Sequence, residues 1–153
     1  MEKFGQYILL EKVAAGGMAE LFKAKKIGIE GFERILAIKR ILPHISSDEE
    51  FIDMFIAEAK LVAQLSHKNI AQIYDFGKMG NNYFIAMEYV DGKDLAEIIQ
   101  EGDPLPLDWV LDVAMGVLQA LSYAHSQGVV HRDVKPDNVM IADEVKLTDF
   151  GLA

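Results

Sequence analysis

The chain contains no cysteine among its 153 residues, so it cannot be a disulfide-stapled domain and offers no thiolate metal site. Its four prolines and twelve glycines follow no repeat, which excludes a collagen-like chain. Hydrophobic residues make up 51% of the sequence, too many for a disordered chain. The length suits one domain that buries a core of its own.

Positive charge and long apolar runs are also scarce. Fifteen Lys and Arg stand against 24 Asp and Glu, a net charge of −9, whereas a protein that neutralises nucleic-acid phosphates needs a basic face. No stretch reaches the roughly 18 apolar residues that cross a bilayer, and the first residues lack the core of a signal peptide. We therefore expect no nucleic-acid partner, no membrane segment in this chain and a cytoplasmic location.

Short runs of β-forming residues dominate the first part of the chain. Turn glycines separate the first three runs, at Gly16-Gly17 and between Gly28 and Gly31, which is typical of an antiparallel meander. Two later runs flank Gly80-Asn81-Asn82 and predict a hairpin. The five runs cover residues 7–13, 20–26, 34–41, 70–76 and 83–90. The first three predict an antiparallel meander, and the last two predict a hairpin.

Helical patterns follow the third and the fifth of these runs. Ser46-Ser47-Asp48 offers N-cap oxygens, and apolar residues from Phe51 to Leu65, Met54 and Leu61 among them, recur at helical spacing. Gly128 lies where the C′ glycine of a later helix belongs. The later helices are expected over residues 94–100 and 107–127, and a small hairpin is expected to pair 139–141 with 145–147.

Glu58 and Lys39 each lie among apolar residues. Glu58 falls within the apolar stripe of the first helix, three residues after Phe55, and Lys39 directly follows the apolar run 35–38. Because an unpaired buried charge is costly, the two anomalies together predict a partly buried Lys39–Glu58 ion pair. Taken singly, each is equally well explained as a surface residue.

The most specific pattern is His131-Arg132-Asp133-Val134-Lys135-Pro136-Asp137-Asn138, followed by Asp149-Phe150-Gly151. H-R-D with an Asn five residues after its Asp arises by chance in roughly one chain of this size in a thousand. Here the chain resembles the protein kinases, whose catalytic loop is H-R-D-x-x-x-x-N and whose magnesium-binding motif is D-F-G. The form H-R-D-x-K-P-x-N resembles the serine/threonine branch of that family.

The resemblance implies transfer of the γ-phosphoryl group of MgATP to a Ser or Thr hydroxyl of a protein substrate. Asp133 would orient the attacking hydroxyl or accept its proton, and Lys135 would neutralise the transferring phosphate. Asn138 and Asp149 would hold Mg²⁺, which prefers hard oxygen ligands. Lys39 would hold the α- and β-phosphates of ATP while paired with Glu58.

The resemblance extends to the ATP pocket. Ala37-Ile38-Lys39 matches the family's V-A-I-K strand. Met87 matches the gatekeeper of the hinge, and the backbone of Glu88 and Val90 would bond the adenine edge. Asp94 matches the acid that contacts the ribose. The positions around the adenine ring are matched by Val13, Leu21, Ala37 and Met140. The internal hydrophobic column of active kinases is matched by Val62, Ile73, His131 and Phe150.

The phosphate-covering loop departs from the family's G-x-G-x-x-G. It runs Ala14-Ala15-Gly16-Gly17-Met18-Ala19, keeping the middle glycine, Gly16, and adding Gly17. Alanine tolerates positive φ poorly and holds the backbone a methyl group farther from phosphate, so we expect looser ATP binding. Gly-Gly-Met with flanking alanines resembles bacterial eukaryote-like (Hanks-type) kinases, myxobacterial ones in particular.

The resemblance implies an α+β, protein-kinase-like fold. Residues 4–90 would form a complete amino-terminal lobe and hinge, with one helix beside the five-stranded sheet, and 91–153 the mostly helical start of the carboxy-terminal lobe. We expect a partial kinase domain truncated after D-F-G, whose long helix exposes an apolar stripe that favours self-association. Two alternatives remain at this point: a nucleotide-binding or regulatory module without phosphotransfer, and an inert fragment.

Overall fold

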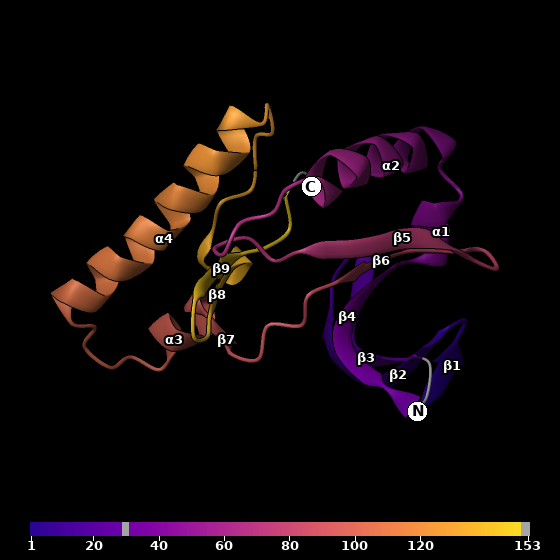
Figure 1. Ribbon diagram of the computed structural model, residues 1–153, viewed down its shortest axis with the longest axis horizontal. Helices are drawn as coiled ribbons and strands as arrows, with labels where there is room; N and C mark the ends of the chain where they lie inside the picture. Colours follow the sequence, from indigo (N-terminus) through magenta and orange to yellow (C-terminus); the bar gives the residue numbers. More distant parts are fainter. Residues whose placement is uncertain (29–30, 151–153) are drawn as a thin grey trace. The chain divides into compact units, whose positions relative to one another are not determined.

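The computed structural model describes residues 1–28 and 31–150, so the turn expected between Gly28 and Gly31 lies partly outside the described residues. The chain forms two compact units. The first contains residues 1–59 and 73–89, and the second contains 60–72 and 90–153. Together they give an α+β fold, the predicted class (Figure 1).

The first unit is built on an antiparallel sheet of six strands in the order β1-β2-β3-β4-β6-β5. The strands are β1 (Glu2–Phe4), β2 (Tyr7–Ala15), β3 (Ala19–Ile27), β4 (Glu33–Ile41), β5 (Ile73–Met79) and β6 (Asn82–Met87). Five correspond to the predicted runs, although β5 begins three residues later than expected. The prediction of five strands was wrong because it missed β1. This strand has a single buried residue, Phe4, and therefore no alternating pattern.

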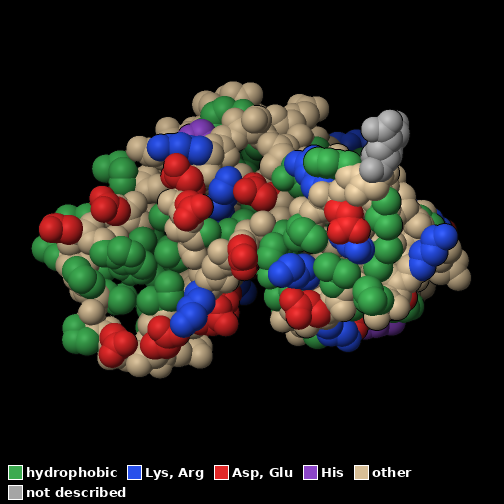
Figure 2. Space-filling model, turned by 60° about the horizontal axis from the view of Figure 1, so that its bottom comes forward, with side chains coloured by type: hydrophobic (Ala, Val, Ile, Leu, Met, Phe, Trp, Pro, Cys, Tyr) green, Lys and Arg blue, Asp and Glu red, His purple; other side chains and the backbone are tan. Residues whose placement is uncertain are grey.

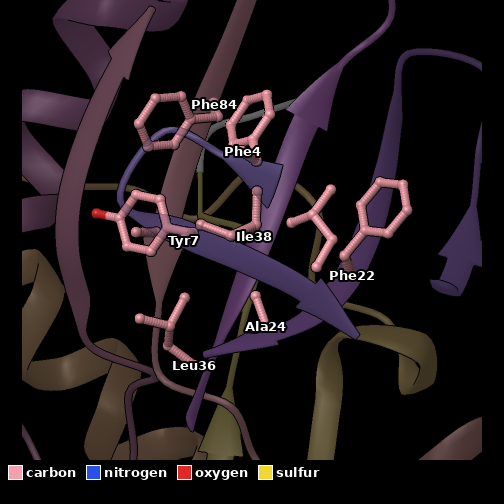
Figure 3. Packing of buried hydrophobic residues seen from close by; sticks show 9 residues of the cluster. Phe4, Tyr7, Phe22, Ala24, Leu36, Ile38 and Phe84 are labelled. Carbon is pink, nitrogen blue, oxygen red and sulfur yellow. The ribbon is translucent and has the colours of Figure 1, made fainter. Parts of the chain in front are cut away.

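A cluster of buried side chains from all of these strands except β5 forms the core of the first unit (Figure 3). The ring of Phe84 packs edge-to-face against two others in the cluster, with centroids 5.2 Å from Phe4 and 5.7 Å from Tyr7. The Tyr7 hydroxyl donates a hydrogen bond of 3.2 Å to Asp75 Oδ2 of β5. β2 and β5 are far apart in the strand order, so this contact requires a strongly curved sheet.

Two helices follow β4. The short α1 (Pro43–Ser46) starts with proline at its first position and was not predicted. In α2 (Glu49–Ala63), the backbone N–H of Phe51 donates to Asp48 Oδ1 at 3.1 Å, which confirms the predicted cap. Its buried stripe consists of Ile52, Phe55, Ala59 and Val62. Met54 and Leu61, predicted to belong to that stripe, are exposed.

The second unit combines helices with a small sheet. α3 (Leu95–Gln100) begins with a capping box in which Asp94 and Glu97 exchange side-chain-to-backbone hydrogen bonds, so Asp94 is the N-cap, not the first helical residue. α4 spans Leu107–Ser126. Gly128 follows its C-cap, and the φ of +76° at this glycine suits the predicted C′ position. The predicted hairpin of β8 (Val139–Ile141) and β9 (Val145–Leu147) gains a third strand, β7 (Lys93–Asp94).

Close backbone approaches fix this sheet. A β-carbon on Gly116 of α4 would lie 2.9 Å from Val145 Cβ, so α4 packs tightly on β9 at this point. The loop before β5 is held as well, because Leu147 donates to the carbonyl of Asn69, and Ala71 donates to the carbonyl of Leu147. The Nδ2 of Asn69 donates to the carbonyl of Val145 at 2.8 Å. Residues 60–72 thus belong to the second unit although β5 follows them directly.

One side of α4 carries exposed apolar residues, as predicted. Hydrophobic side chains gather on the surface around α3 and α4 (Figure 2). The exposed ones are Ile99, Leu105, Leu107, Val110, Leu111, Met115 and Leu118. In the described part of the chain, no helix is long and apolar enough to cross a membrane.

Candidate active site

The catalytic loop is organised around a buried histidine. His131 lies at the core of the second unit, and its Nε2 donates a hydrogen bond of 2.7 Å to the carbonyl of Thr148. Its Nδ1 accepts one of 3.1 Å from the backbone N–H of Asp133. A neutral imidazole with its proton on Nε2 satisfies both bonds. His131 therefore ties the loop that carries Asp133 to the segment that precedes Asp149.

Asn138 brings the predicted catalytic and magnesium-binding groups together. It lies in the short 3₁₀ turn η2 (Pro136–Asn138) and is buried. Its Nδ2 donates to the carbonyl of Asp133 at 2.8 Å and to Asp133 Oδ2 at 3.2 Å. The carbonyl of Asn138 in turn accepts the backbone N–H of Thr148 at 2.9 Å. Because its nitrogen faces Asp133, the Asn138 side-chain oxygen is left to serve as a hard ligand.

Lys135 completes the cluster around Asp133. Its Nζ lies 3.5 Å from Asp133 Oδ2, with both side chains partly open to solvent. One Asp133 carboxylate oxygen therefore has an amide donor and an ammonium group beside it. Such an arrangement limits the rotation of the carboxylate. Asp133, Lys135 and Asn138, predicted to act together, do lie together.

Two residues of this loop and of the D-F-G motif adopt left-handed backbone conformations. Arg132 has φ of +68° and Asp149 has φ of +58°, the only positive values outside glycine among the described residues. Such conformations cost free energy and persist where packing fixes them. Here Phe150, which is buried, packs on His131 with ring centroids 4.5 Å apart. Strain therefore concentrates at the two predicted motifs.

The donor set fits a magnesium ion that is only partly held by protein. No cluster of three or more His, Asp or Glu side chains suited to a metal occurs within residues 1–28 and 31–150. Mg²⁺ usually takes one or two protein oxygens and completes its shell with water and substrate phosphate. Asn138 and Asp149, predicted to hold the ion, offer an amide and a carboxylate oxygen, so the chemistry of these donors fits Mg²⁺.

The second unit also contains predicted nucleotide contacts. Asp94 pairs with Met140 in the β7–β8 ladder, so the residues predicted to contact the ribose and the adenine are register partners. The side chain of Asp94 already accepts the N–H of Glu97 through Oδ1. A ribose contact at Asp94 would thus share its carboxylate with the cap of α3. Val90 is predicted to bond adenine. It is the residue at which the chain passes from the first unit back into the second.

The first unit brings other predicted ATP contacts to one face of its sheet. Leu21 pairs with Lys39 and Ala37 with Met87. Side chains alternate along a strand, so these residues lie opposite the face that carries the buried cluster of Leu36 and Ile38. Ala37 and Met87 are buried. Glu88 lies just beyond β6, and the predicted ion pair between Lys39 and Glu58 of α2 stays a prediction.

The β2–β3 turn differs from its prediction. Neither Gly16 nor Gly17 has positive φ, and Ala14, Ala15 and Ala19 do not either. The alanines therefore cause no backbone strain, and that reason for expecting looser ATP binding was wrong. The turn is closed by the N–H of Gly16, which donates to the carbonyl of Ala19 at 2.9 Å.

Val13, predicted to contact adenine, lies at a bulge. Lys12 pairs with Phe22 and Ala14 with Leu21, so Val13 is the extra residue in the β2–β3 ladder. Its side chain is half exposed. Bulges often turn a side chain toward a binding site, which agrees with the role predicted for Val13.

Sequence reasoning missed Thr148 and Asn69. Thr148 bonds both His131 and Asn138, and Asn69 anchors the loop before β5 to β9. Thr148 acts mainly through its backbone, which leaves no signal in side-chain type. His67 accepts the N–H of Asn69 and stacks on Tyr123, with ring centroids 5.2 Å apart.

Comparisons with known proteins agree with this geometry. The family model described as protein kinase domain matches residues 7–153. The chain belongs to the protein kinase family. Its known relatives include the tyrosine-protein kinase MasK of Myxococcus xanthus, 40% identical over the whole of this chain and 26% of MasK. The serine/threonine-protein kinase PrkC of Bacillus subtilis is 38% identical over 97% of this chain and 23% of PrkC.

Solved structures give the same fold. The crystal structure of the Mycobacterium tuberculosis PknI kinase domain superposes with a TM-score of 0.85 at 34% identity, covering 99% of this chain and 62% of that one. The chain is thus a bacterial Hanks-type kinase domain sequence with a protein-kinase-like fold. It spans about a quarter of the length of the curated relatives named above. Membership of the kinase family implies the use of ATP and Mg²⁺.

Proposed function

We propose that this chain carries the catalytic residues of an ATP-dependent serine/threonine protein kinase. The observation that carries the proposal is the cluster of Asp133, Asn138 and Lys135, in which one amide orients the carboxylate and an ammonium group lies 3.5 Å from it. Phosphoryl transfer depends on positioning and charge neutralisation more than on covalent chemistry, and this cluster suits both.

Each residue of the cluster has a distinct role in the proposed reaction. Asp133 orients the acceptor hydroxyl and takes its proton as the hydroxyl oxygen bonds to the γ-phosphorus of ATP. The bond from that phosphorus to the β-phosphate oxygen breaks, and ADP leaves. Lys135, whose ammonium group lies 3.5 Å from Asp133 Oδ2, neutralises charge on the transferring phosphoryl group. Asn138 and Asp149 would hold Mg²⁺, which would supply neutralisation of phosphate charge. His131 touches no substrate and acts by holding Asp133 in place.

The remaining proposed contacts bind the nucleotide. Lys39 holds the α- and β-phosphates and is positioned by Glu58, while Gly16 and Gly17 form the turn over the phosphates. The adenine is placed between apolar side chains and bonded by the hinge backbone. The adenine and ribose contacts are Val13, Leu21, Ala37, Met87, Glu88, Val90, Asp94 and Met140.

The choice of Ser/Thr over Tyr rests on the Lys135-Pro136 pair and on the names of several relatives, PrkC among them. MasK is named a tyrosine-protein kinase, so acceptor chemistry needs a direct measurement. The experiment incubates the chain with radiolabelled MgATP and a peptide mixture of Ser, Thr and Tyr acceptors, then identifies the phosphorylated amino acid. The proposal expects phosphoserine and phosphothreonine, and phosphotyrosine alone would contradict it.

Asp133→Asn tests the mechanism in the same assay, and transfer should fall by at least about 10³-fold because the proton acceptor is lost. Asp137→Asn is the matched control, since Asp137 is an exposed carboxylate of the same loop. Its transfer rate should stay within about twofold of the original. An Asp133→Asn chain with near-normal transfer would contradict the assigned role.

MgATP binding without transfer would instead favour the nucleotide-binding module. The same preparation therefore needs a binding measurement beside the transfer assay. Saturable binding with no labelled peptide would keep the pocket assignments and remove the proposed phosphotransfer from this chain. If the chain shows neither MgATP binding nor transfer, the inert fragment is the alternative that remains.

A further inference from the structure

An ion network joins the four strands β1 to β4 beside the β2–β3 turn. Glu20 of β3 lies at its centre, with Oε1 at 2.5 Å from the ammonium group of Lys12 and Oε2 at 3.0 Å from the guanidinium group of Arg40. Arg40 also bonds Glu2 at 3.1 Å. Only 18% of the Glu20 side chain and 19% of the Arg40 side chain are exposed, so this is more than a loose surface contact.

Arg40 is held by aromatic rings as well. Its guanidinium carbon lies 4.6 Å from the ring centroid of Phe22 and 5.9 Å from that of Phe4. Arg40 follows Leu36 and Ile38 on the core face of β4, whereas its neighbour Lys39 lies on the opposite face. The network therefore does not touch the face proposed to bind nucleotide.

The turn beside this network depends on few backbone bonds. The β2–β3 ladder is interrupted between Leu9 and Glu11 and again between Lys12 and Ala14, shortly before the turn. Beyond the last two pairs of the ladder, Ala14–Leu21 and Ala15–Glu20, the turn is held by Gly16 N–H to Ala19, already described, and by Leu42 N–H to the carbonyl of Met18 at 2.9 Å. The Lys12–Glu20 pair bridges the second interruption, so side chains supply the cross-strand restraint there.

We propose that Glu20, with Lys12 and Arg40 as its partners, is a positioning residue that holds the β2–β3 turn in place for the phosphates of ATP. This inference rests on the proposed function, because it requires that Gly16 and Gly17 cover the phosphates. The two partners stabilise the ionised form of Glu20. Lys12 first, and then Arg40, hold the pKa of the Glu20 carboxyl below its usual range through their hydrogen bonds.

The test compares binding of MgATP and of adenosine to the full chain by titration calorimetry. Adenosine lacks phosphates, so loss of turn positioning should weaken MgATP binding and spare adenosine. For Glu20→Gln we expect MgATP affinity to fall roughly fivefold while adenosine affinity stays within about twofold. Lys12→Met removes only the bridge across the bulge, and we expect a fall of roughly twofold to threefold for MgATP alone.

Glu33→Gln is the matched control. Glu33 pairs with Lys25 at 2.6 Å, also across neighbouring strands of the same sheet but at the end away from the turn. Its loss should change neither affinity. Circular dichroism of each variant establishes that the sheet is folded, and Lys12→Met, a change at a half-exposed side chain, carries the test if Glu20→Gln does not fold.

The outcomes separate this inference from the proposed function. If the unaltered chain shows no saturable MgATP binding, the proposed function fails and the positioning role fails with it. If the unaltered chain binds MgATP and Glu20→Gln binds it equally well, only the positioning role is overturned. Equal losses for MgATP and adenosine would also overturn it, because they indicate a general structural role for the network.

Discussion

Gly92 allows the backbone that leads into β7 to lie close to β8 of the same small sheet. A β-carbon at this residue would lie 2.1 Å from the carbonyl oxygen of Ile141, far inside any real contact. Gly92 directly precedes β7, which pairs Asp94 with Met140. One hydrogen atom in place of a methyl group thus permits the ladder that aligns two predicted nucleotide contacts.

Gly92→Ala should therefore lower the free energy of unfolding by about 1–3 kcal/mol, because backbone must move to admit the methyl group. Chemical denaturation measures the change. Gly17→Ala is the control for folding, since Gly17 has no atom within 4 Å of a built β-carbon and no positive φ. Equal stability of the Gly92→Ala and unaltered chains would show that the close approach is not maintained in solution.

Single residues also mark the limit of prediction from sequence. Asp133, Asn138 and Lys135 could be predicted to act together because fixed spacing reflects one loop conformation. Thr148 could not, because it contributes mainly backbone groups that any residue has. The conformation of Gly16 and Gly17 was also out of reach, since glycine permits positive φ without requiring it.

Among the secondary-structure elements, β2 and β5 are joined by the Tyr7–Asp75 hydrogen bond, which links strands distant in the sheet order. Burial, followed by the negative charge of Asp75, raises the pKa of the Tyr7 hydroxyl. A raised pKa in the folded chain means that the protonated form is favoured by folding. The stabilisation is complete below the usual tyrosine pKa of about 10 and is lost as pH rises through the folded value.

We therefore expect the free energy of unfolding to fall more steeply above about pH 10 in the unaltered chain than in Tyr7→Phe. Denaturation curves from pH 8 to 11.5 measure both slopes. At pH 8 the variant should be less stable by about 1 kcal/mol, because Asp75 loses a donor. Identical slopes above pH 10 would indicate that the hydroxyl is not buried against Asp75.

Elements with strong local signals were predictable and weak ones were not. α4 and its terminal Gly128 matched to within a residue because the apolar period is long and a glycine follows it. β1 and β7 were missed because strands of three and two residues carry no period. The predicted buried stripe of α2 wrongly included Met54 and Leu61, which are apolar but exposed. Apolar character alone does not establish burial.

At the scale of the molecule, exposed apolar side chains gather around α3 and α4 on the face shown in Figure 2. Leu111 and Leu118, seven residues apart, lie on one side of α4 and are both exposed. Such a surface favours association between copies of the chain. The expectation of self-association made from the sequence stays a prediction.

Leu118→Glu should weaken that association by roughly tenfold, because a charge replaces a side chain that association would bury. Sedimentation velocity over a range of concentrations measures it. Gln119→Glu adds the same charge at the neighbouring exposed position and should have little effect. A monomer at all concentrations in the unaltered chain would be evidence against association through α4.

We have proposed that this kinase-family chain binds MgATP through the residues named above. The most direct measurement is the melting temperature of the chain with millimolar ATP, in the presence of Mg²⁺ and in the presence of EDTA. A ligand that binds the folded chain alone must raise its stability. We expect ATP to raise the melting temperature more in the presence of Mg²⁺ than in the presence of EDTA. In Asp149→Asn the two rises should be equal. No rise at millimolar MgATP would contradict the claim.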